Sequence, residues 1–232
     1  MQQKITIHNK RGEKLVGVLH ETGSEKIVVL CHGFRSSKEQ KAIVKLAVLL
    51  EDEGISAFRF DFSGNGESEG AFHYGNYLSE AEDLRAVIEY FIELNRSTTA
   101  IIGHSKGGNV VLVYASKYHD IGIVVNLSGR YVLNRGIKER LGVVDYRVTK
   151  ESMMERLNLN MNEACHSIDK RCIVLTVHGS ADKVIPVEDA LEFAKIIPNH
   201  KLQIIQGANH GYSSHHIELA ALVLPFIKYS CI

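Results

Sequence analysis

The sequence has no excess of charge of either sign. Its 232 residues include 27 basic and 27 acidic side chains, so the formal net charge at pH 7 is zero. A balanced chain lacks the strong positive field that attracts nucleic acids or acidic membranes. We therefore expect no nucleic-acid partner.

Long apolar runs are also missing. No stretch approaches the roughly 20 apolar residues that a helix needs to cross a bilayer. The first residues, from Met1 to Lys4, lead into a strand-like alternation and not into the apolar core of a signal peptide. These absences predict a cytoplasmic protein with no integral membrane association.

Cysteine is sparse and has no paired spacing. The chain has four cysteines, Cys31, Cys165, Cys172 and Cys231, and no Cys-x-x-Cys motif. Free cysteine in an apolar strand behaves as a small hydrophobic residue, so we expect reduced, structural thiols. The 12 histidines show no ligand spacing of a zinc type, so no metal and no other cofactor is expected.

An alternation of strand-like and helix-like segments fills most of the chain. It predicts an α/β fold with a mostly parallel sheet covered by helices on both faces, and the length suits one domain over 1–232. A hairpin is expected from 5–7 and 15–20, and further strands at 27–31, 55–60, 99–102, 121–127, 172–177 and 202–205. Helices are expected at 38–53, 78–95, 109–118, 187–196 and 214–228.

One stretch, at about 130–170, interrupts this alternation. It lies between two expected core strands, where a simple crossover needs about a dozen residues. Its composition is polar with scattered apolar positions and is helical in places, for example at 150–157. We interpret it as an insertion in the domain.

The segment Gly103-His104-Ser105-Lys106-Gly107-Gly108 follows one expected strand and precedes an expected helix. A nucleophilic serine between strand and helix occupies a strained turn, and the residues two before and two after it must be small. Gly103 and Gly107 meet this demand. The same pattern also occurs as an ordinary glycine-rich turn with a solvated serine, so its context decides.

Two strand-end loops supply that context. Asp182 follows the strand expected at 172–177, and His210 follows the strand expected at 202–205. The chain order is therefore serine, acid, histidine. Asp61 also follows a strand and is the alternative acid, but it precedes Ser105, so we favour Asp182.

With these residues the chain resembles the α/β-hydrolase family of serine hydrolases from about residue 14 to the C-terminus. It is most similar to small-cap esterases of the serine aminopeptidase, monoacylglycerol lipase and feruloyl (cinnamoyl) esterase type. The segment His32-Gly33-Phe34 and the run from Phe60 to Ser68 add to this resemblance. It implies the α/β-hydrolase fold, with the insertion as a small helical cap over the serine.

The resemblance also implies roles for individual residues. The backbone N–H groups of Phe34 and Lys106 would form the oxyanion hole, although related esterases often carry Gln or Met where this chain has Lys106. In the cap, Tyr131, Asp145 and Tyr146 either hydrogen-bond a polar end of the substrate, such as a phenol, or lie on a solvated surface. A cap this short suggests a compact substrate.

The residue types predict the chemistry. A serine hydroxyl is a poor nucleophile at neutral pH, so Ser105 needs His210 as a base and Asp182 to orient that base. We predict a serine esterase that cleaves small to medium carboxylic esters, such as hydroxycinnamoyl or short-chain acyl esters, through an acyl-enzyme. The alternatives are a hydrolase-fold ligand-binding protein with slow turnover, or a thioesterase, amidase or carbon–carbon hydrolase. These motifs do not specify the oligomeric state.

Overall fold

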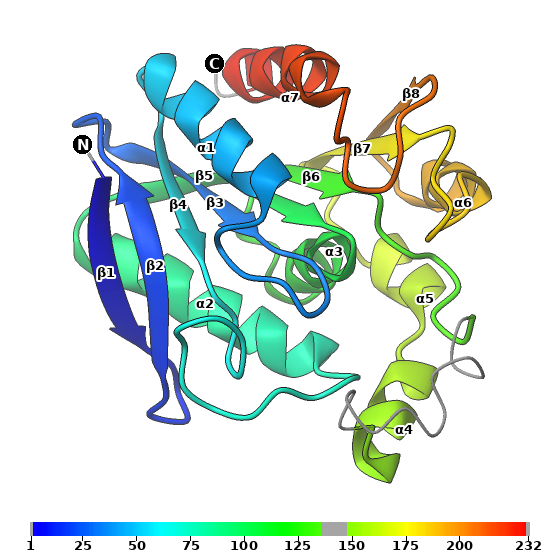
Figure 1. The fold of residues 1–232 in the computed structure, drawn as a ribbon, viewed down its shortest axis with the longest axis horizontal. Coiled ribbons are helices and arrows are strands. Elements are labelled where there is room, and N and C mark those ends of the chain that lie inside the picture. Colours follow the sequence, from blue (N-terminus) through cyan, green and yellow to red (C-terminus); the bar gives the residue numbers. More distant parts are fainter. Residues whose placement is uncertain (1, 136–147, 231–232) are drawn as a thin grey trace.

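A central β-sheet organises the molecule (Figure 1). The computed structural model describes residues 2–135 and 148–230. In these residues the sheet has eight strands in the order β1-β2-β4-β3-β5-β6-β7-β8. The strands are β1 (Gln2–His8), β2 (Lys14–His20), β3 (Lys26–Cys31), β4 (Ser56–Phe60), β5 (Ser97–His104), β6 (Ile123–Leu127), β7 (Ile173–Gly179) and β8 (His200–Ile205).

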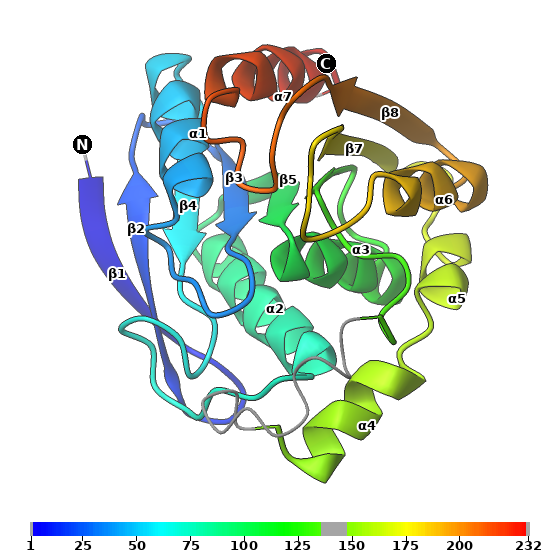
Figure 2. The same ribbon diagram turned by 45° about the vertical axis from the view of Figure 1, so that its right-hand side comes forward.

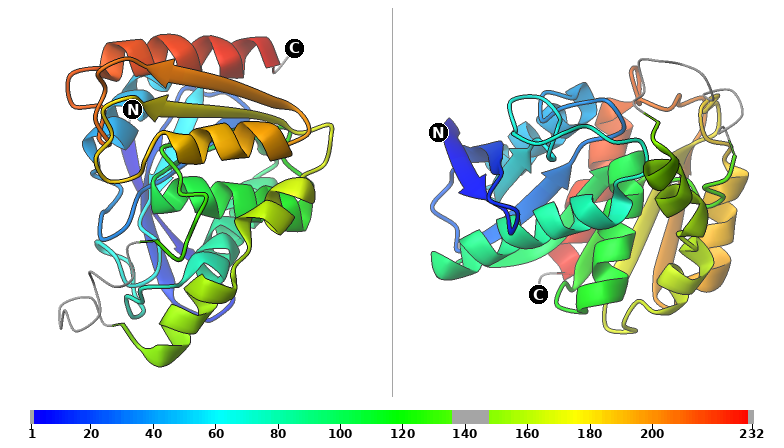
Figure 3. Two further views of the ribbon diagram at one scale, coloured as in Figure 1. Left: turned by 90° about the vertical axis from the view of Figure 1, so that its right-hand side faces the viewer. Right: turned by 90° about the horizontal axis from the view of Figure 1, so that it is seen from below.

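The helices form a layer on each face of this sheet, as Figure 3 shows from the side. They are α1 (Lys41–Asp52), α2 (Tyr77–Glu93), α3 (Lys106–Tyr118), α4 (Lys150–Asn158), α5 (Met161–His166), α6 (Glu188–Ile196) and α7 (His216–Ser230). Helices α1 and α7 share one apolar core with the sheet, and α2, α3, α5 and α6 share the other. The predicted α/β architecture is confirmed.

The strand directions also agree with the prediction. β1 pairs with β2 and β2 with β4 in antiparallel fashion, while the pairs from β4 through β8 are all parallel. The central parallel strands β3 and β6 have nearly continuous apolar sequences, as expected for strands covered on both faces, while the edge strand β8 alternates polar and apolar residues. Their carboxyl ends lie at one edge of the sheet, where ligands bind in open α/β folds.

Two predicted helix starts differ from the structure by three residues. α1 begins at Lys41 and not at Lys38, because residues 37–40 form a turn and the Lys38 backbone N–H donates to the Asp61 carboxylate at 2.6 Å. α3 begins at Lys106 and not at Asn109, directly after the serine. Gly107 and Gly108 lie in the first helical turn.

The insertion contributes two short helices. α5 packs into the main core through Met161 and Cys165. α4 lies farther out (Figure 1) and approaches the start of α2, where the Leu78 backbone N–H donates to Glu155 at 3.1 Å. In the described residues no helix is long and apolar enough to cross a membrane.

Candidate active site

Ser105 occupies a strained turn between β5 and α3. Its φ of 55° and ψ of −117° lie in a region that L-residues seldom adopt. A Cβ atom at Gly103 would collide with the Gly107 carbonyl, and one at Gly107 would collide with the backbone of β3 and His32. The two glycines are therefore required for the turn to close, as the sequence predicted.

The structure brings Asp182 and His210 together. The Nδ1 atom of His210 lies 2.7 Å from Oδ2 of Asp182, which makes Nδ1 the donor and leaves Nε2 as the acceptor of a neutral imidazole. The Asp182 side chain is fully buried, while that of His210 is 18% exposed. Figure 2 shows the loops after β3 and β7 close to the junction of β5 and α3.

Several donors hold the Asp182 carboxylate. The backbone N–H groups of Val184 and Ile185 donate to Oδ1 at 2.8 and 2.9 Å. Nε2 of His178 lies 3.3 Å from Oδ2 of Asp182 and 3.0 Å from the Ile185 carbonyl, so it carries the proton. Burial alone would raise the pKa of Asp182, but the bonds from His178 and His210 outweigh it and hold this pKa well below its usual range.

Asp61 has a different environment. Its carboxylate accepts from the backbone N–H of Lys38 and lies 2.7 Å from Nζ of the same residue. A third bond comes from the backbone N–H of Glu67 at 2.9 Å. The partners of Asp61 thus order the loops after β3 and β4, and of the two candidate acids it is Asp182 that bonds to His210.

A chain of hydrogen bonds connects the loop after β3 to the loop that carries His210. The Gly33 backbone N–H donates to Oε1 of Gln40 at 2.9 Å, which identifies the other atom as the amide nitrogen. This nitrogen lies 2.5 Å from Nδ1 of His104, and Nε2 of His104 lies 2.7 Å from the His210 carbonyl. His104 therefore accepts at Nδ1 and donates at Nε2, and burial lowers its pKa to about 4.

His32 supports the expected oxyanion loop. Its Nε2 accepts from the Phe62 backbone N–H at 3.1 Å, so Nδ1 carries the proton and donates to the Gly33 carbonyl at 2.8 Å. Phe34, the next residue, packs its ring against Tyr74, with the ring centroids 5.6 Å apart. These contacts fix the backbone at the position from which the Phe34 N–H is expected to act.

Ser105 and His210 face one cavity of about 190 Å³. Phe34 and Lys106 also line it, so the residues expected to act on the oxyanion border the same space. The remaining lining residues are Tyr77, Asn109, Arg130, Arg156, Val184 and Ile185.

The side chain of Lys106 is buried beside this cavity. Its Nζ lies 2.6 Å from Oε1 of Glu80, and both side chains are about 5% exposed or less. The Tyr77 ring lies 5.1 Å from the same nitrogen. Burial raises the pKa of Glu80 to about 7, although Lys106 acts in the opposite direction.

The expected cap residues do not line this cavity together. Tyr131 packs edge-on against Phe193 at 5.2 Å, and its hydroxyl accepts from the Asn162 side chain at 2.7 Å. It is absent from the residues that surround Ser105. Asp145 and Tyr146 lie outside the described residues.

Sequence reasoning missed several residues of the site. Asn109 lies one helical turn after Ser105, so its position could have been found from helical spacing. His178 lies at the end of β7, four residues before Asp182, and alternation along the strand gave no reason to aim it at the acid. Tyr77 and Arg156 come from separate elements and carry no local signal.

Comparison with known proteins identifies the family. The profile of the serine aminopeptidase S33 family matches residues 22–143, more than half of the chain, and this span includes the Ser105 turn. The chain belongs to this family. Its members are hydrolases, and the observed sheet and helices form the α/β-hydrolase fold.

Relatives and solved structures agree with this assignment. The Bacillus subtilis protein named "Putative esterase YitV" is 25% identical over 227 residues, which cover 85% of each chain. Est1E of Butyrivibrio proteoclasticus, solved with ferulic acid bound, superposes with a TM-score of 0.86 at 24% identity, covering 98% of this chain and 99% of Est1E. The Pyrococcus furiosus esterase Pf2001 superposes with a TM-score of 0.80 at 24% identity, covering 99% of this chain and 90% of Pf2001.

Proposed function

We propose that this S33-family hydrolase is a serine esterase that cleaves small to medium carboxylic esters through an acyl-enzyme. The observation that carries the proposal is the 2.7 Å contact between His210 and the buried Asp182, next to a strained Ser105 that shares a cavity with His210. The names of YitV, Est1E and Pf2001 support ester substrates.

In the first step Nε2 of His210 accepts the proton of Ser105 as Oγ attacks the ester carbonyl. The negative charge that develops on the carbonyl oxygen is stabilised by the N–H groups of Phe34 and Lys106 and by the N-terminal end of α3. Asp182 keeps Nδ1 protonated and stabilises the imidazolium.

The tetrahedral intermediate then collapses. The bond between the carbonyl carbon and the leaving oxygen breaks, and His210 returns the proton to the departing alcohol. Water repeats the sequence: His210 takes one proton, the hydroxide oxygen bonds to the acyl carbon, and Ser105 leaves with the proton that His210 gives back. The products are one acid and one alcohol.

The cavity and the insertion support a compact substrate. The volume of about 190 Å³ is below the 300–1,000 Å³ that is usual for small-molecule sites. We infer one domain in which the insertion at about 130–170 acts as a small cap, because α4 contributes Arg156 to the wall of this cavity. Hydroxycinnamoyl and short-chain acyl esters are both within this proposal.

The test is hydrolysis of 4-nitrophenyl acetate, butyrate and octanoate, with methyl ferulate beside them. The wild type should turn over at least one ester many times, and Ser105→Ala should lose about 10⁴-fold or more in kcat. Ser214→Ala, an exposed serine on the loop that follows His210, is the matched control and should retain full activity. Turnover that survives in Ser105→Ala would reject the proposed nucleophile.

A further inference from the structure

Arg156 is a buried cation in the wall of the Ser105 cavity. Its residue is 4% exposed. Nε donates to the Leu133 carbonyl at 2.8 Å, one terminal nitrogen donates to the Tyr77 hydroxyl at 3.1 Å, and the other donates to the Arg135 carbonyl at 3.2 Å. The guanidinium carbon lies 4.7 Å from the centre of the Tyr74 ring. All of these partners are neutral.

These bonds do not use the full donor capacity of the guanidinium. Arginine has five N–H donors, and the bonds to described residues occupy three of them. Among residues 2–135 and 148–230, no partner is found for the second N–H of either terminal nitrogen. The two terminal nitrogens of one guanidinium can bind the two oxygens of a carboxylate in bidentate fashion.

The charges around the cavity single out this arginine. Among the described residues, the lining includes Lys106, Arg130 and Arg156 but no aspartate or glutamate. Lys106 is paired with Glu80 at 2.6 Å, and Arg130 donates to the Val184 carbonyl and has further interactions. In the part of the chain that the structure describes, Arg156 has no anionic partner. Burial of a cation without such a partner is unfavourable, so a ligand that supplies an anion would bind more tightly.

We propose that the natural substrate is an ester that also carries an ionised carboxylate, and that Arg156 binds this carboxylate. This inference rests on the proposed function, because the ester group must reach Ser105 across the same cavity. The limited volume favours a short spacer between the two groups, as in the monoester of a short dicarboxylic acid. Hydrolysis of such a monoester consumes one water and releases a dicarboxylic acid and the alcohol.

The test compares substrates that differ only in the carboxylate. In the first pair, mono-4-nitrophenyl adipate carries the carboxylate on the acyl side, and 4-nitrophenyl hexanoate is its neutral partner. In the second pair, 4-carboxyphenyl butyrate carries the carboxylate on the alcohol side, and phenyl butyrate is its neutral partner. The background rate is measured with Ser105→Ala, and kcat/KM is expressed as the ratio of the anionic ester to its neutral partner.

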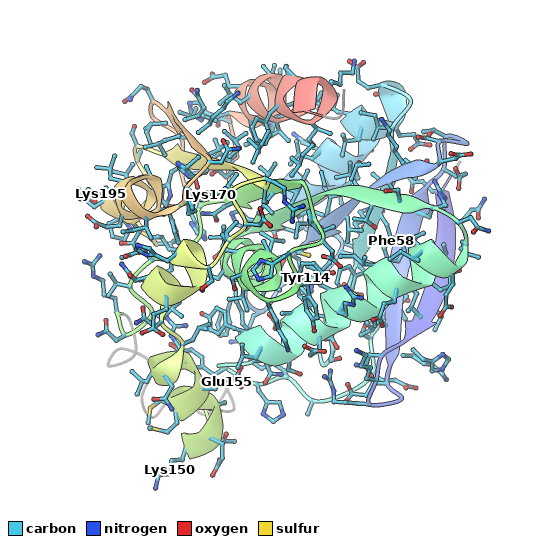
Figure 4. All side chains as sticks on the ribbon, turned by 180° about the vertical axis from the view of Figure 1, so that it is seen from behind. Phe58, Tyr114, Lys150, Glu155, Lys170 and Lys195 are labelled. Carbon is cyan, nitrogen blue, oxygen red and sulfur yellow. The ribbon has the colours of Figure 1, made fainter. Side chains whose placement is uncertain are left out.

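We expect this ratio to exceed 10 for at least one pair in the wild type. Arg156→Met should lower it by about 10- to 100-fold, the effect of one charge-assisted bond, and Arg156→Lys should fall between the two. Lys150→Met is the matched control. Lys150 lies on the same helix α4, is exposed, and extends from its outer end in Figure 4, so its loss should leave the ratio unchanged.

The possible failures are distinguishable. If the wild type turns over no ester of either kind, the proposed function itself fails. Ser105-dependent hydrolysis with no preference for the anionic ester in either pair would overturn only the present inference. The same holds if Arg156→Met lowers kcat/KM equally for the anionic ester and its neutral partner. Arg156 would then have a structural role, holding the chain at 133–135. Should Arg156→Met not fold, competitive inhibition of the wild type decides: adipamate, the monoamide of adipic acid with one ionised carboxylate, must inhibit at least 10-fold more strongly than the neutral diamide adipamide.

Discussion

The two sides of the Ser105 cavity are built differently. On one side, loops at the carboxyl ends of β5, β7 and β8 hold Ser105, Asp182 and His210 through short bonds to backbone groups and buried histidines. On the other side, α2 and α4 present Tyr77 and Arg156 to the same space. We call these the strand-end side and the cap side. From this comparison we propose that the strand-end side determines the type of reaction and that the cap side selects the substrate.

The largest effect should come from the strand-end side, with Asp182→Asn. The amide keeps the size of the side chain but disfavours the tautomer in which Nδ1 of His210 is the donor, so kcat should fall by about 10³- to 10⁴-fold. KM should change little, because the cap side is intact. Steady-state kinetics with a 4-nitrophenyl ester provide the measurement. Asp61→Asn is the comparison, and an equal loss of kcat in a folded Asp61→Asn protein would contradict the assignment of the acid.

A second prediction concerns the buried pair at the boundary between the two sides. Glu80→Gln leaves the Lys106 ammonium buried without its carboxylate, so the free energy of unfolding should fall by about 3–5 kcal/mol. The double variant Glu80→Leu with Lys106→Met removes both charges and should regain most of this loss. Urea unfolding at pH 8, where Glu80 is ionised, measures both proteins. Equal losses in the single and double variants would show that packing, not charge, holds this pair.

A smaller effect should follow from breaking the hydrogen-bond chain at Gln40. Gln40→Leu removes both the acceptor for the Gly33 N–H and the donor to His104. The loops that carry Phe34 and His210 are then no longer connected through this side chain. Misplacement of catalytic groups by a fraction of an ångström should lower kcat by about 10- to 100-fold. Gln206→Ala, at an exposed turn, is the control. An unchanged kcat would mean that this chain does not position His210.

The last prediction concerns the pH dependence of stability. Burial lowers the pKa of His32, His104 and His200 to about 4, so at pH 5.5 these side chains are neutral in the folded protein and mostly charged after unfolding. Glu80 opposes this, since burial raises its pKa to about 7. Together the four groups take up a net of roughly two protons on unfolding at this pH, and stability should fall as the pH drops from 6.5 to 4.

Urea unfolding at half-unit pH steps measures this slope. His200→Gln should reduce the slope of the unfolding free energy against pH, because the variant no longer takes up a proton at this position on unfolding. His200 is the suitable position for this variant, since it lies in β8 and bonds to Thr176 away from the Ser105 cavity. A slope that stays the same in His200→Gln, or a stability that rises on acidification, would contradict the pKa assignments.

The strand-end side could be predicted largely from the sequence, and the reason is local. The turn at 103–108 requires glycine at Gly103 and Gly107. Each of the other two residues, Asp182 and His210, follows a strand that the sequence pattern predicts. Parallel strands carry their loops to one edge, so the order along the chain was enough to bring these residues together.

The cap side could not be predicted in this way. Arg156 reaches the cavity because α4 packs against the start of α2, a contact between distant segments that no periodicity encodes. Tyr131, for which the sequence left open either a substrate contact or a solvated surface, packs on Phe193. The start of α1 was misplaced for a similar reason, since the bond from Lys38 to Asp61 is a tertiary contact that overrides helical propensity.

The role of Ser105 as nucleophile is tested most directly by covalent labelling with a fluorophosphonate ester, followed by peptide mass spectrometry. We expect one phosphonyl group per chain, located on Ser105, with loss of esterase activity in proportion to labelling and slower labelling in Asp182→Asn. Stoichiometric labelling at another residue, or full activity in a protein that carries the adduct on Ser105, would contradict this role.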